Sequence, residues 1–338
     1  MRQIVLERPQ SIVLRDAPKP DPRPGDALVR SEQVGICGSD LHAYHGKHPF
    51  IILPVVPGHE VVGTVEALGE GATNVKIGDR VVLEPNIVCG ECVHCRSGRY
   101  NLCEKLTVIG CVGPLDGAMA DYFIAPAERL IPVDPLLDLT QAAMIEPLAT
   151  GTHAVRVAGG TNGKRVAVLG SGSIGLLTMQ AAKAGGAATI VVTDLSTEKR
   201  QRALDLGADA AFDPREPDRV EAMRARLGRP ADVVFDCVAI QATMDQAIAL
   251  AHKGGTVIVE GVPEADVTVP LAIIQDREIR IQGTAMYTRE DMLSAMHLIA
   301  NGAVDAKSLV TKIMPLERAA DAFAAADTGG EIKVHLRV

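Results

Sequence analysis

The stretch Val166–Gly175, which reads VAVLGSGSIG, decides the fold of the second half of the chain. Four apolar residues suit a short buried strand, and the next six fit the pattern G-x-G-x-x-G at the start of a helical segment. Glycines in this pattern allow a tight turn and let backbone N–H groups approach a pyrophosphate at a helix N-terminus. The stretch therefore predicts a dinucleotide-binding loop, in which the cofactor-binding residues are Gly170, Gly172, Ser173, Ile174 and Gly175.

A second strand of the same type ends at Asp194, nineteen residues after Gly175. A carboxylate at this distance accepts hydrogen bonds from ribose hydroxyls and repels a 2′-phosphate, so the sequence favours NAD over NADP. Arg200 is a further candidate for cofactor contact, although it and Lys199 also suit the solvated face of a helix. A glycine-rich turn that binds no ligand is the alternative for the whole motif.

From Gly163 onward, short apolar runs alternate with helical patterns. This alternation predicts an α/β fold with a doubly wound parallel sheet, the Rossmann arrangement. Thr256–Glu260 is expected to reach an edge of this sheet where subunits meet. The expected strands are Arg165–Leu169, Thr189–Thr193, Val233–Asp236 and Thr256–Glu260, and the expected helices are Ile174–Ala184, Thr197–Leu206 and Ala242–Ala251.

The first half of the chain has a different pattern. Up to about residue 131, β-branched segments such as Val61–Val65 and Arg80–Leu83 alternate with Gly and Pro turns, which predicts a β-rich, barrel-like domain. The C-terminal segment returns to mixed helix and strand patterns and is expected to rejoin this domain. We therefore predict a discontinuous β-rich domain, residues 1–150 and 288–338, and a dinucleotide-binding domain, residues 151–287.

Composition limits the possible partners. The chain has 338 residues, 47% of them hydrophobic, and its 34 Lys and Arg against 42 Asp and Glu give a net charge of −8. Two compact domains are expected at this length, and the acidic balance without any basic run argues against nucleic acid and anionic membranes. Glu7 and Arg8 interrupt any secretory leader, and no window approaches the ~18 uninterrupted apolar residues of a membrane span, so a cytoplasmic location is expected.

Four of the seven cysteines lie within fifteen residues, at Cys89, Cys92, Cys95 and Cys103. Four thiolates at this spacing suit a tetrahedral zinc ion, and a closed shell of four protein ligands leaves no position for substrate. The sequence therefore predicts a structural zinc site. The alternatives are an iron–sulfur cluster, which has a different spacing, and plain reduced thiols.

A second group of metal-ligand types is spread along the chain. Cys37, His59 and one of the two carboxylates, Glu60 or Glu146, would supply three ligands and leave a fourth position open, as in a catalytic zinc site, if they converge. Taken singly, Cys37 also has the properties of a small apolar residue in a core. Glu146 also has those of a carboxylate that interacts favourably with a helix N-terminus. Cys111 and Cys237 are given no role beyond packing.

Six motifs in this order resemble the zinc-dependent medium-chain alcohol dehydrogenase family over essentially the whole chain. They are GICGSDLH at 35–42, PGHE at 57–60, the four cysteines, EPLA at 146–149, GSGSIG at 170–175 and VVTDLS at 191–196. Glu146 in place of a ligating cysteine is similar to the polyol, butanediol and threonine dehydrogenase branch. The resemblance implies a GroES-like catalytic domain, a Rossmann domain, two zinc ions per chain and NAD.

The resemblance also implies residue roles. Cys37 and His59 would bind the catalytic zinc. Glu60 and Glu146 would be acidic ligands or close neighbours of the ion, and the resemblance favours neither of them over the other. Ser39 would take the proton from the zinc-bound alcohol and pass it through the nicotinamide ribose toward His42. Hydride transfer to the nicotinamide then yields a ketone, in a reversible reaction. Relatives imply a homodimer or homotetramer.

Met286 limits the range of expected substrates, because polyol dehydrogenases tend to carry an arginine at this position, before a tyrosine. A secondary alcohol or vicinal diol is therefore expected first, a sugar alcohol second and threonine third. A non-catalytic, zinc-stabilised NAD-binding sensor or scaffold is the alternative from a different class. Loss of a ligand or relay residue would favour it, but Cys37, His59, Ser39 and His42 are all present. A zinc-free quinone reductase would lack the four-cysteine lobe and the GHE residues at 58–60, so it fits less well.

Overall fold

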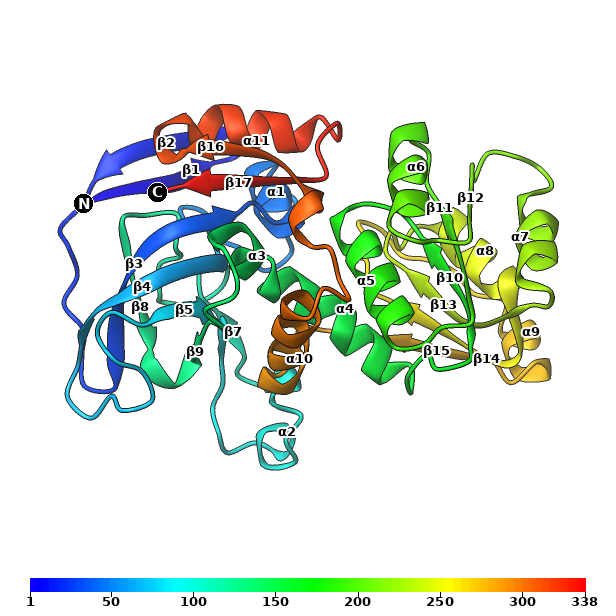
Figure 1. Ribbon diagram of the computed structural model, residues 1–338, viewed down its shortest axis with the longest axis horizontal. Coiled ribbons are helices and arrows are strands. Elements are labelled where there is room, and N and C mark those ends of the chain that lie inside the picture. Colours follow the sequence, from blue (N-terminus) through cyan, green and yellow to red (C-terminus); the bar gives the residue numbers. More distant parts are fainter. The chain divides into compact units, whose positions relative to one another are not determined.

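A computed structural model describes all residues, 1–338, and its internal contacts divide the chain into two compact units (Figure 1). The first unit comprises Met1–Glu146, Thr288–Ala300 and Ala306–Val338. The second unit comprises Pro147–Tyr287 and Asn301–Asp305. The first and last parts of the chain, blue and red in Figure 1, thus fold together.

The first unit contains a seven-stranded sheet with the strand order β16-β17-β3-β4-β5-β9, in which β8 also pairs with β3. Its strands are β3 (Asp26–Gly35), β4 (Glu60–Leu68), β5 (Arg80–Leu83), β8 (Tyr122–Pro126), β9 (Leu130–Pro132), β16 (Val310–Pro315) and β17 (Lys333–Arg337). Two small sheets pair β1 (Arg2–Arg8) with β2 (Ser11–Asp16) and β6 (Asn86–Ile87) with β7 (Thr107–Val108).

The helices of the first unit are short and lie between these strands along the chain. They are α1 (Gly38–Tyr44), α2 (Val93–Arg96), α3 (Leu139–Ala143), α10 (Arg289–Ala300) and α11 (Ala319–Asp327), with the 3-10 helices η1 (Tyr100–Leu102), η2 (Ala127–Arg129), η3 (Lys307–Leu309) and η4 (Leu316–Arg318).

One apolar core holds the first unit together. It joins Val29 of β3, Phe323 of α11 and Leu336 of β17, all buried, so the C-terminal segment packs against strands near the N-terminus. Each fully buried side chain of this size contributes roughly 1.5–3 kcal/mol relative to exposure. This core explains why residues 306–338 belong to the first unit.

The second unit contains a six-stranded parallel sheet with the order β12-β11-β10-β13-β14-β15. The residues of β10 from Val166 to Leu169 are fully buried, as expected for a strand covered on both faces. The strands are β10 (Arg165–Leu169), β11 (Thr189–Thr193), β12 (Ala210–Phe212), β13 (Ala231–Asp236), β14 (Ala251–Val259) and β15 (Arg280–Gly283).

The helices of the second unit alternate with its strands. They are α5 (Ser173–Ala184), α6 (Thr197–Asp205), α7 (Arg219–Leu227), α8 (Gln241–Leu250) and α9 (Leu271–Asp276), and α4 (Ile145–Val157) contains the boundary between the units. The expected fold class, a β-rich domain with a doubly wound parallel sheet, is confirmed. No helix combines the length and the apolar character needed to cross a membrane.

Two details of the sequence prediction are wrong. Thr256–Glu260 is not at a sheet edge, because its strand β14 lies between β13 and β15, and the edge strands are β12 and β15. Ala251 was expected in a helix, but it is extended and pairs with Ala231. Strand β14 begins earlier than expected because the glycine pair Gly254-Gly255, which is typical of a turn, lies inside the strand.

Candidate metal centres and dinucleotide loop

The four cysteine sulfurs of the lobe between β6 and β7 lie close to one another. Cys92 and Cys95 have sulfurs 3.5 Å apart, Cys89 and Cys103 3.5 Å, and Cys89 and Cys95 3.9 Å. A tetrahedral ion 2.3 Å from each sulfur separates them by about 3.8 Å. The donor set and its spacing therefore fit a closed, structural zinc site.

Backbone N–H groups in this lobe point at the sulfurs. Cys89 donates to the Cys103 sulfur at 3.3 Å, and Lys105 donates to the same atom at 3.4 Å. Backbone N–H groups of Cys95 and Glu104 lower the pKa of the Cys92 thiol to about 6. Each of these contacts favours the thiolate, which is the form that binds a metal.

A second converging group lies in the first unit, where β3 leads into α1 and where β4 begins. Cys37 is the N-cap residue of α1, and His59 and Glu60 stand at the start of β4. Their ligand atoms all lie within 4.8 Å of one another. One sulfur, one imidazole and one carboxylate supply three donors, the number that leaves a catalytic zinc with an open position.

Gly35 makes room for the carboxylate in this group. It lies opposite Glu60 in the antiparallel pairing of β3 and β4, and a Cβ atom at Gly35 would meet Glu60 Oε2 at 2.0 Å. The Glu60 side chain thus passes over β3 toward β17, which pairs with the other side of β3. Any side chain at position 35 would displace the carboxylate.

On β17, Lys333 meets this carboxylate. Its ammonium nitrogen lies 2.5 Å from Glu60, and both side chains are almost completely buried, at 4% and 1% exposure. Burial alone would lower the pKa of Lys333, but Glu60 and Cys37 outweigh it and raise the pKa. Lys333 is a residue that the sequence analysis missed, and no local motif marks it.

His59 has two further neighbours that the sequence analysis also missed. Cys111 has its sulfur 3.3 Å from Nδ1 of His59, and Asp40, His59 and Cys111 form another group with ligand atoms within 4.8 Å. Asp40 lies inside the GICGSDLH motif, so a carboxylate partner for a ligating histidine could have been expected there. Cys111 carries no signal of this kind.

The electrostatics of this group favour a cation. Burial alone would lower the pKa of His59, but Cys111 and Cys37 raise it well above its usual value. Burial raises the pKa of Asp40 to about 6, even though His59 and the Cys37 N–H oppose the shift. Surroundings that stabilise an imidazolium also stabilise a bound divalent ion, so the residues fit zinc.

The two predicted relay residues share one face of α1. Ser39 and His42 are three positions apart, the spacing at which helix side chains are neighbours. Ser39 Oγ is buried and has no hydrogen-bond partner. A buried hydroxyl without a partner costs free energy, so this atom is suited to a substrate group. His45, the C-cap residue of α1, instead pairs with Asp327 at 2.7 Å.

Glu146, the other predicted acidic ligand, is buried near the start of α4. It lies outside the group formed by Cys37, His59 and Glu60. Its charge nevertheless contributes to the raised pKa of Lys333. The structure therefore brings Glu60, and not Glu146, within ligand distance of Cys37 and His59.

The predicted dinucleotide loop joins β10 to α5 and needs its glycines. Gly170 has a φ of +93°, and a Cβ atom at Gly175 would meet the Gly170 carbonyl oxygen at 1.8 Å. A Cβ atom at Gly172, the N-cap of α5, would meet nothing within 4 Å, so the space above the helix N-terminus is open. Ser173 Oγ is buried there without a partner. With Ile174 half-buried beside it, this cradle fits a pyrophosphate.

Asp194 stands at the end of β11, beside this loop. Its carboxylate accepts hydrogen bonds from the Ser171 N–H at 2.8 Å and from the Ser196 N–H at 2.9 Å. The Arg200 guanidinium donates to the Asp194 carbonyl at 2.7 Å and pairs with Asp213 at 3.2 Å. Arg200 thus shares the Asp213 carboxylate with Arg215, which lies 2.5 Å from it.

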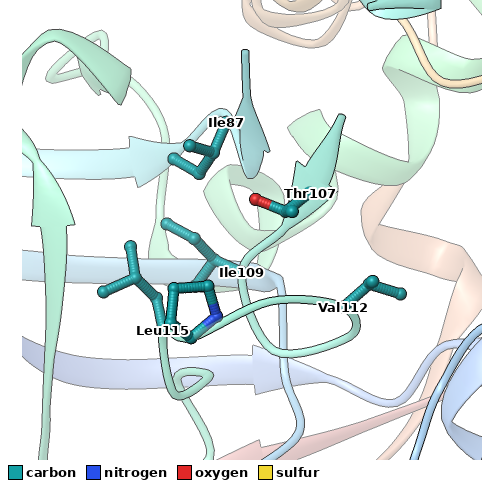
Figure 2. Close-up of a pocket in the computed structure, with 6 residues that line it drawn as sticks. Ile87, Thr107, Ile109, Val112 and Leu115 are labelled. Atoms are coloured by element: carbon teal, nitrogen blue, oxygen red, sulfur yellow. The ribbon is translucent and has the colours of Figure 1, made fainter. Parts of the chain in front are cut away.

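A small cavity lined in part by Ile109 and Val112 is not the binding site of the metal or the cofactor. It measures about 60 Å³ and lies between β6, β7 and the loop that follows β7. Figure 2 shows the side chains around it, which are Ile87, Thr107, Ile109, Val112, Pro114 and Leu115. Its size and apolar lining suit neither a dinucleotide nor a metal ion.

Comparison with known families covers most of the chain. Residues 23–135 match the alcohol dehydrogenase GroES-like domain, and residues 173–301 match the zinc-binding dehydrogenase domain. The first match contains both metal groups of the first unit. The second match begins inside the dinucleotide loop, at Ser173, and contains Asp194 and Arg200.

Three relatives illustrate the likeness. The chain is 37% identical to the sorbitol dehydrogenase of Gallus gallus, over 99% of this chain and 95% of that protein. It superposes on 2R,3R-butanediol dehydrogenase from Bacillus subtilis with a TM-score of 0.92 and 31% identity, covering 100% and 99% of the two chains. A zinc-binding dehydrogenase from Sinorhizobium meliloti 1021, solved with NADP, gives a TM-score of 0.93 and 35% identity, with the same coverage.

Proposed function

The chain belongs to the zinc-dependent medium-chain alcohol dehydrogenase family, and from this premise we propose that it oxidises a secondary alcohol or vicinal diol to the ketone. The alcohol loses a hydride to a nicotinamide dinucleotide and a proton to the protein, and the reaction is reversible. The observation that carries the proposal is the convergence of Cys37, His59 and Glu60 within 4.8 Å of one another, beside the partnerless hydroxyl of Ser39.

Cys37, His59 and Glu60 would hold the catalytic zinc, and Cys89, Cys92, Cys95 and Cys103 the structural one. Bound at the first site, zinc supplies Lewis acidity that brings loss of an alcohol proton toward neutral pH. Glu60, which shares its charge with the ammonium group of Lys333, would be the acidic ligand of the first site. Glu146, buried near the start of α4, would be a neighbouring carboxylate.

Ser39 and His42 would move the proton. The Ser39 hydroxyl accepts the proton of the alcohol as it passes its own proton on toward His42, which lies on the same face of α1 and releases a proton to solvent. Histidine titrates near neutral pH, so it can both accept and release a proton there. Asp40 would orient His59, because a carboxylate beside a ligating imidazole fixes its tautomer.

We propose NAD as the preferred cofactor, held by Gly170, Gly172, Ser173, Ile174, Gly175 and Asp194. Asp194 supports this preference, because it places a negative charge where a 2′-phosphate would lie. Titration of the protein with NAD and with NADP tests this preference. A tighter Kd for NADP would assign Arg200 to phosphate binding instead.

The substrate class is tested by NAD reduction with 2,3-butanediol stereoisomers, simple secondary alcohols, sorbitol, xylitol and threonine. Met286, in place of an arginine that would bind a polyol, supports the secondary alcohols and diols. The highest kcat/KM is expected for a 2,3-butanediol stereoisomer or another secondary alcohol. A highest value for sorbitol or xylitol would assign the chain to the sugar alcohols, and one for threonine to the amino alcohols. No turnover with any of them would contradict the proposal.

We also propose that copies of this chain assemble as a homodimer or homotetramer. The edge strand β15 supports this, because three of its four residues are exposed and its outer hydrogen-bonding groups face no neighbouring strand of this chain. Measurement of the molar mass in solution tests the assembly. A monomer at micromolar concentration would contradict it.

A further inference from the structure

One acidic residue of the second unit has no role in the function proposed so far. Glu260 follows β14, and its backbone N–H donates to the Asp236 carbonyl at 2.9 Å. Its Oε2 accepts a hydrogen bond from the Thr178 hydroxyl of α5 at 2.8 Å. Its Oε1 is buried without a partner. Burial of a carboxyl group with one oxygen left without a hydrogen-bond partner costs free energy, which points to a functional reason for Glu260.

Glu260 is one of three such groups at the carboxyl edge of the sheet. Ser173 Oγ, at the start of α5, and Thr284 Oγ1, just after β15, are also buried without partners. Thr284 donates its N–H to Val259 at 3.1 Å, and the register pairs Val259 with Gly283, so Thr284 and Glu260 leave the sheet side by side. Ligands of doubly wound sheets bind at this edge.

The position of β14 in the sheet decides which end of a dinucleotide Glu260 faces. Asp194, which suits the adenosine ribose, follows β11 on one side of β10. The pyrophosphate cradle follows β10 itself, and β13, β14 and β15 lie on the other side. A dinucleotide that crosses this edge therefore places its nicotinamide half over β13–β15.

Close packing connects Glu260 to the glycine loop. Cys237 hydrogen-bonds to Glu260 through its thiol. A Cβ atom at Gly170 would lie 2.6 Å from Val238 Cγ2 and 3.9 Å from Cys237 Cβ. A Cβ atom at Gly261 would lie 2.7 Å from the Val238 carbonyl carbon. The segment after β13 is thus wedged between the dinucleotide loop and the segment that carries Glu260.

The surroundings of Glu260 favour its neutral form. Burial raises the pKa of Glu260 to about 8, and Asp236 adds to this rise, whereas Thr178 and Cys237 oppose it by hydrogen bonding. Asp236 is itself held by the N–H groups of Val238 and Ala239 and by the hydroxyl of Thr243. A nearby cation would favour loss of the Glu260 proton.

We propose that Glu260 is a positioning residue of the nicotinamide subsite and senses the charge of the cofactor. The oxidised nicotinamide carries a positive charge, and the reduced ring carries none. Binding of the oxidised form releases the Glu260 proton to solvent, and binding of the reduced form leaves the carboxyl neutral. Glu260 therefore makes the affinity for the oxidised cofactor rise with pH. This inference rests on the proposed use of a nicotinamide dinucleotide.

The test is the Kd of NAD⁺ and of NADH, measured by calorimetry between pH 6 and 9 on the intact protein and on Glu260→Gln. In the unmodified protein the Kd of NAD⁺ should fall by about tenfold over this range, as one linked proton allows. In Glu260→Gln the Kd of NAD⁺ should fall by no more than about threefold over the same pH range. The pH dependence of the Kd of NADH should be the same in the variant as in the unmodified protein. Calorimetry in two buffers of different ionisation enthalpy should count fewer protons released by the variant when NAD⁺ binds.

Two further variants keep the test decisive. Glu264→Gln removes an exposed carboxylate four residues away and should leave the proton count unchanged. Thr178→Val removes the hydroxyl that stabilises the Glu260 carboxylate and should move the pH profile of NAD⁺ binding to higher pH, even if Glu260→Gln does not fold. If the Kd of NAD⁺ has the same pH profile in the unmodified protein, in Thr178→Val and in any folded Glu260→Gln, this inference is overturned and the proposed cofactor is not. Failure to bind either NAD⁺ or NADH would overturn the proposed cofactor as well.

Discussion

Lys333 and Glu60 form a buried ion pair at 2.5 Å, although 273 residues separate them in the sequence. The pair links β17, near the C-terminus, to the start of β4, where His59 also lies. It is possible only because Gly35, on the strand between them, has no side chain. The acidic member of the metal group is thus held in place by the last strand of the chain.

Replacing Lys333 by methionine leaves Glu60 buried without its counter-charge. Removal of one partner of a buried ion pair typically costs about 3–5 kcal/mol, so Lys333→Met should lower the free energy of unfolding by that order and reduce turnover. Chemical denaturation and steady-state kinetics measure both effects. Lys312→Met is the matched control, since Lys312 pairs with Glu331 at an exposed site on the neighbouring strand and should cost about 0–1 kcal/mol. Equal costs for the two variants would refute this account of the pair.

His335 should make the fold sensitive to acid. Burial, together with Lys333 and Arg337, lowers the pKa of His335 to about 3. The unfolded chain protonates this histidine near pH 6.5 and the folded protein does not, so stability falls as the pH drops from about 6.5 toward 3. One such group removes about 2 kcal/mol from the free energy of unfolding between pH 7 and 5. His335→Gln should flatten this part of the profile, whereas substitution of the exposed His297 should not.

Ser39→Ala removes the hydroxyl proposed to accept the proton of the alcohol. General base groups contribute roughly 10²–10⁴-fold to rate, so kcat should fall by at least about a hundredfold. The Kd of the dinucleotide should stay within about twofold, because Ser39 lies in the first unit and the glycine loop in the second. Stopped-flow and binding measurements separate the two effects. An unchanged kcat would remove Ser39 from the proton path.

Asp194→Ala removes the carboxylate beside the glycine loop. The KM for NAD should rise, and discrimination against NADP should relax, because the repulsion of a 2′-phosphate is lost. Ser171 loses a hydrogen-bond partner in the same variant, so Asp194→Asn serves as the control that keeps polarity and removes charge. Unchanged cofactor kinetics in both variants would exclude Asp194 from the site.

Local patterns predict much of the second unit. The strands β10 and β11 begin and end where the apolar runs predict, because a parallel strand covered on both faces is a continuous apolar segment. The glycine loop is visible for a similar reason, since its turn and close approaches require glycine at fixed positions. The start of β14 was missed, because Gly254-Gly255 within it resembles a turn.

Contacts between distant segments were beyond sequence reasoning. Cys111, which lies beside His59, and Lys333, which lies beside Glu60, belong to no local motif. Lys333 is brought into place only because β17 pairs with one side of β3 and β4 with the other. Glu260 was taken as the end of a strand, and its burial follows from the packing of α5 against that strand. Sequence spacing indicates which residue types are available, and the sheet order decides which of them meet.

The central claim is that Cys37, His59 and a carboxylate hold an ion with an open position, separate from the four-cysteine site. Zinc content per chain, measured by mass spectrometry on the unmodified protein, Cys37→Ser and Cys95→Ser, tests it most directly. The account predicts about two zinc ions in the unmodified protein. It predicts about one in Cys37→Ser, which folds but has no turnover, and impaired folding or assembly in Cys95→Ser. Two zinc ions and full turnover in Cys37→Ser, or a single zinc ion in the unmodified protein, would contradict it.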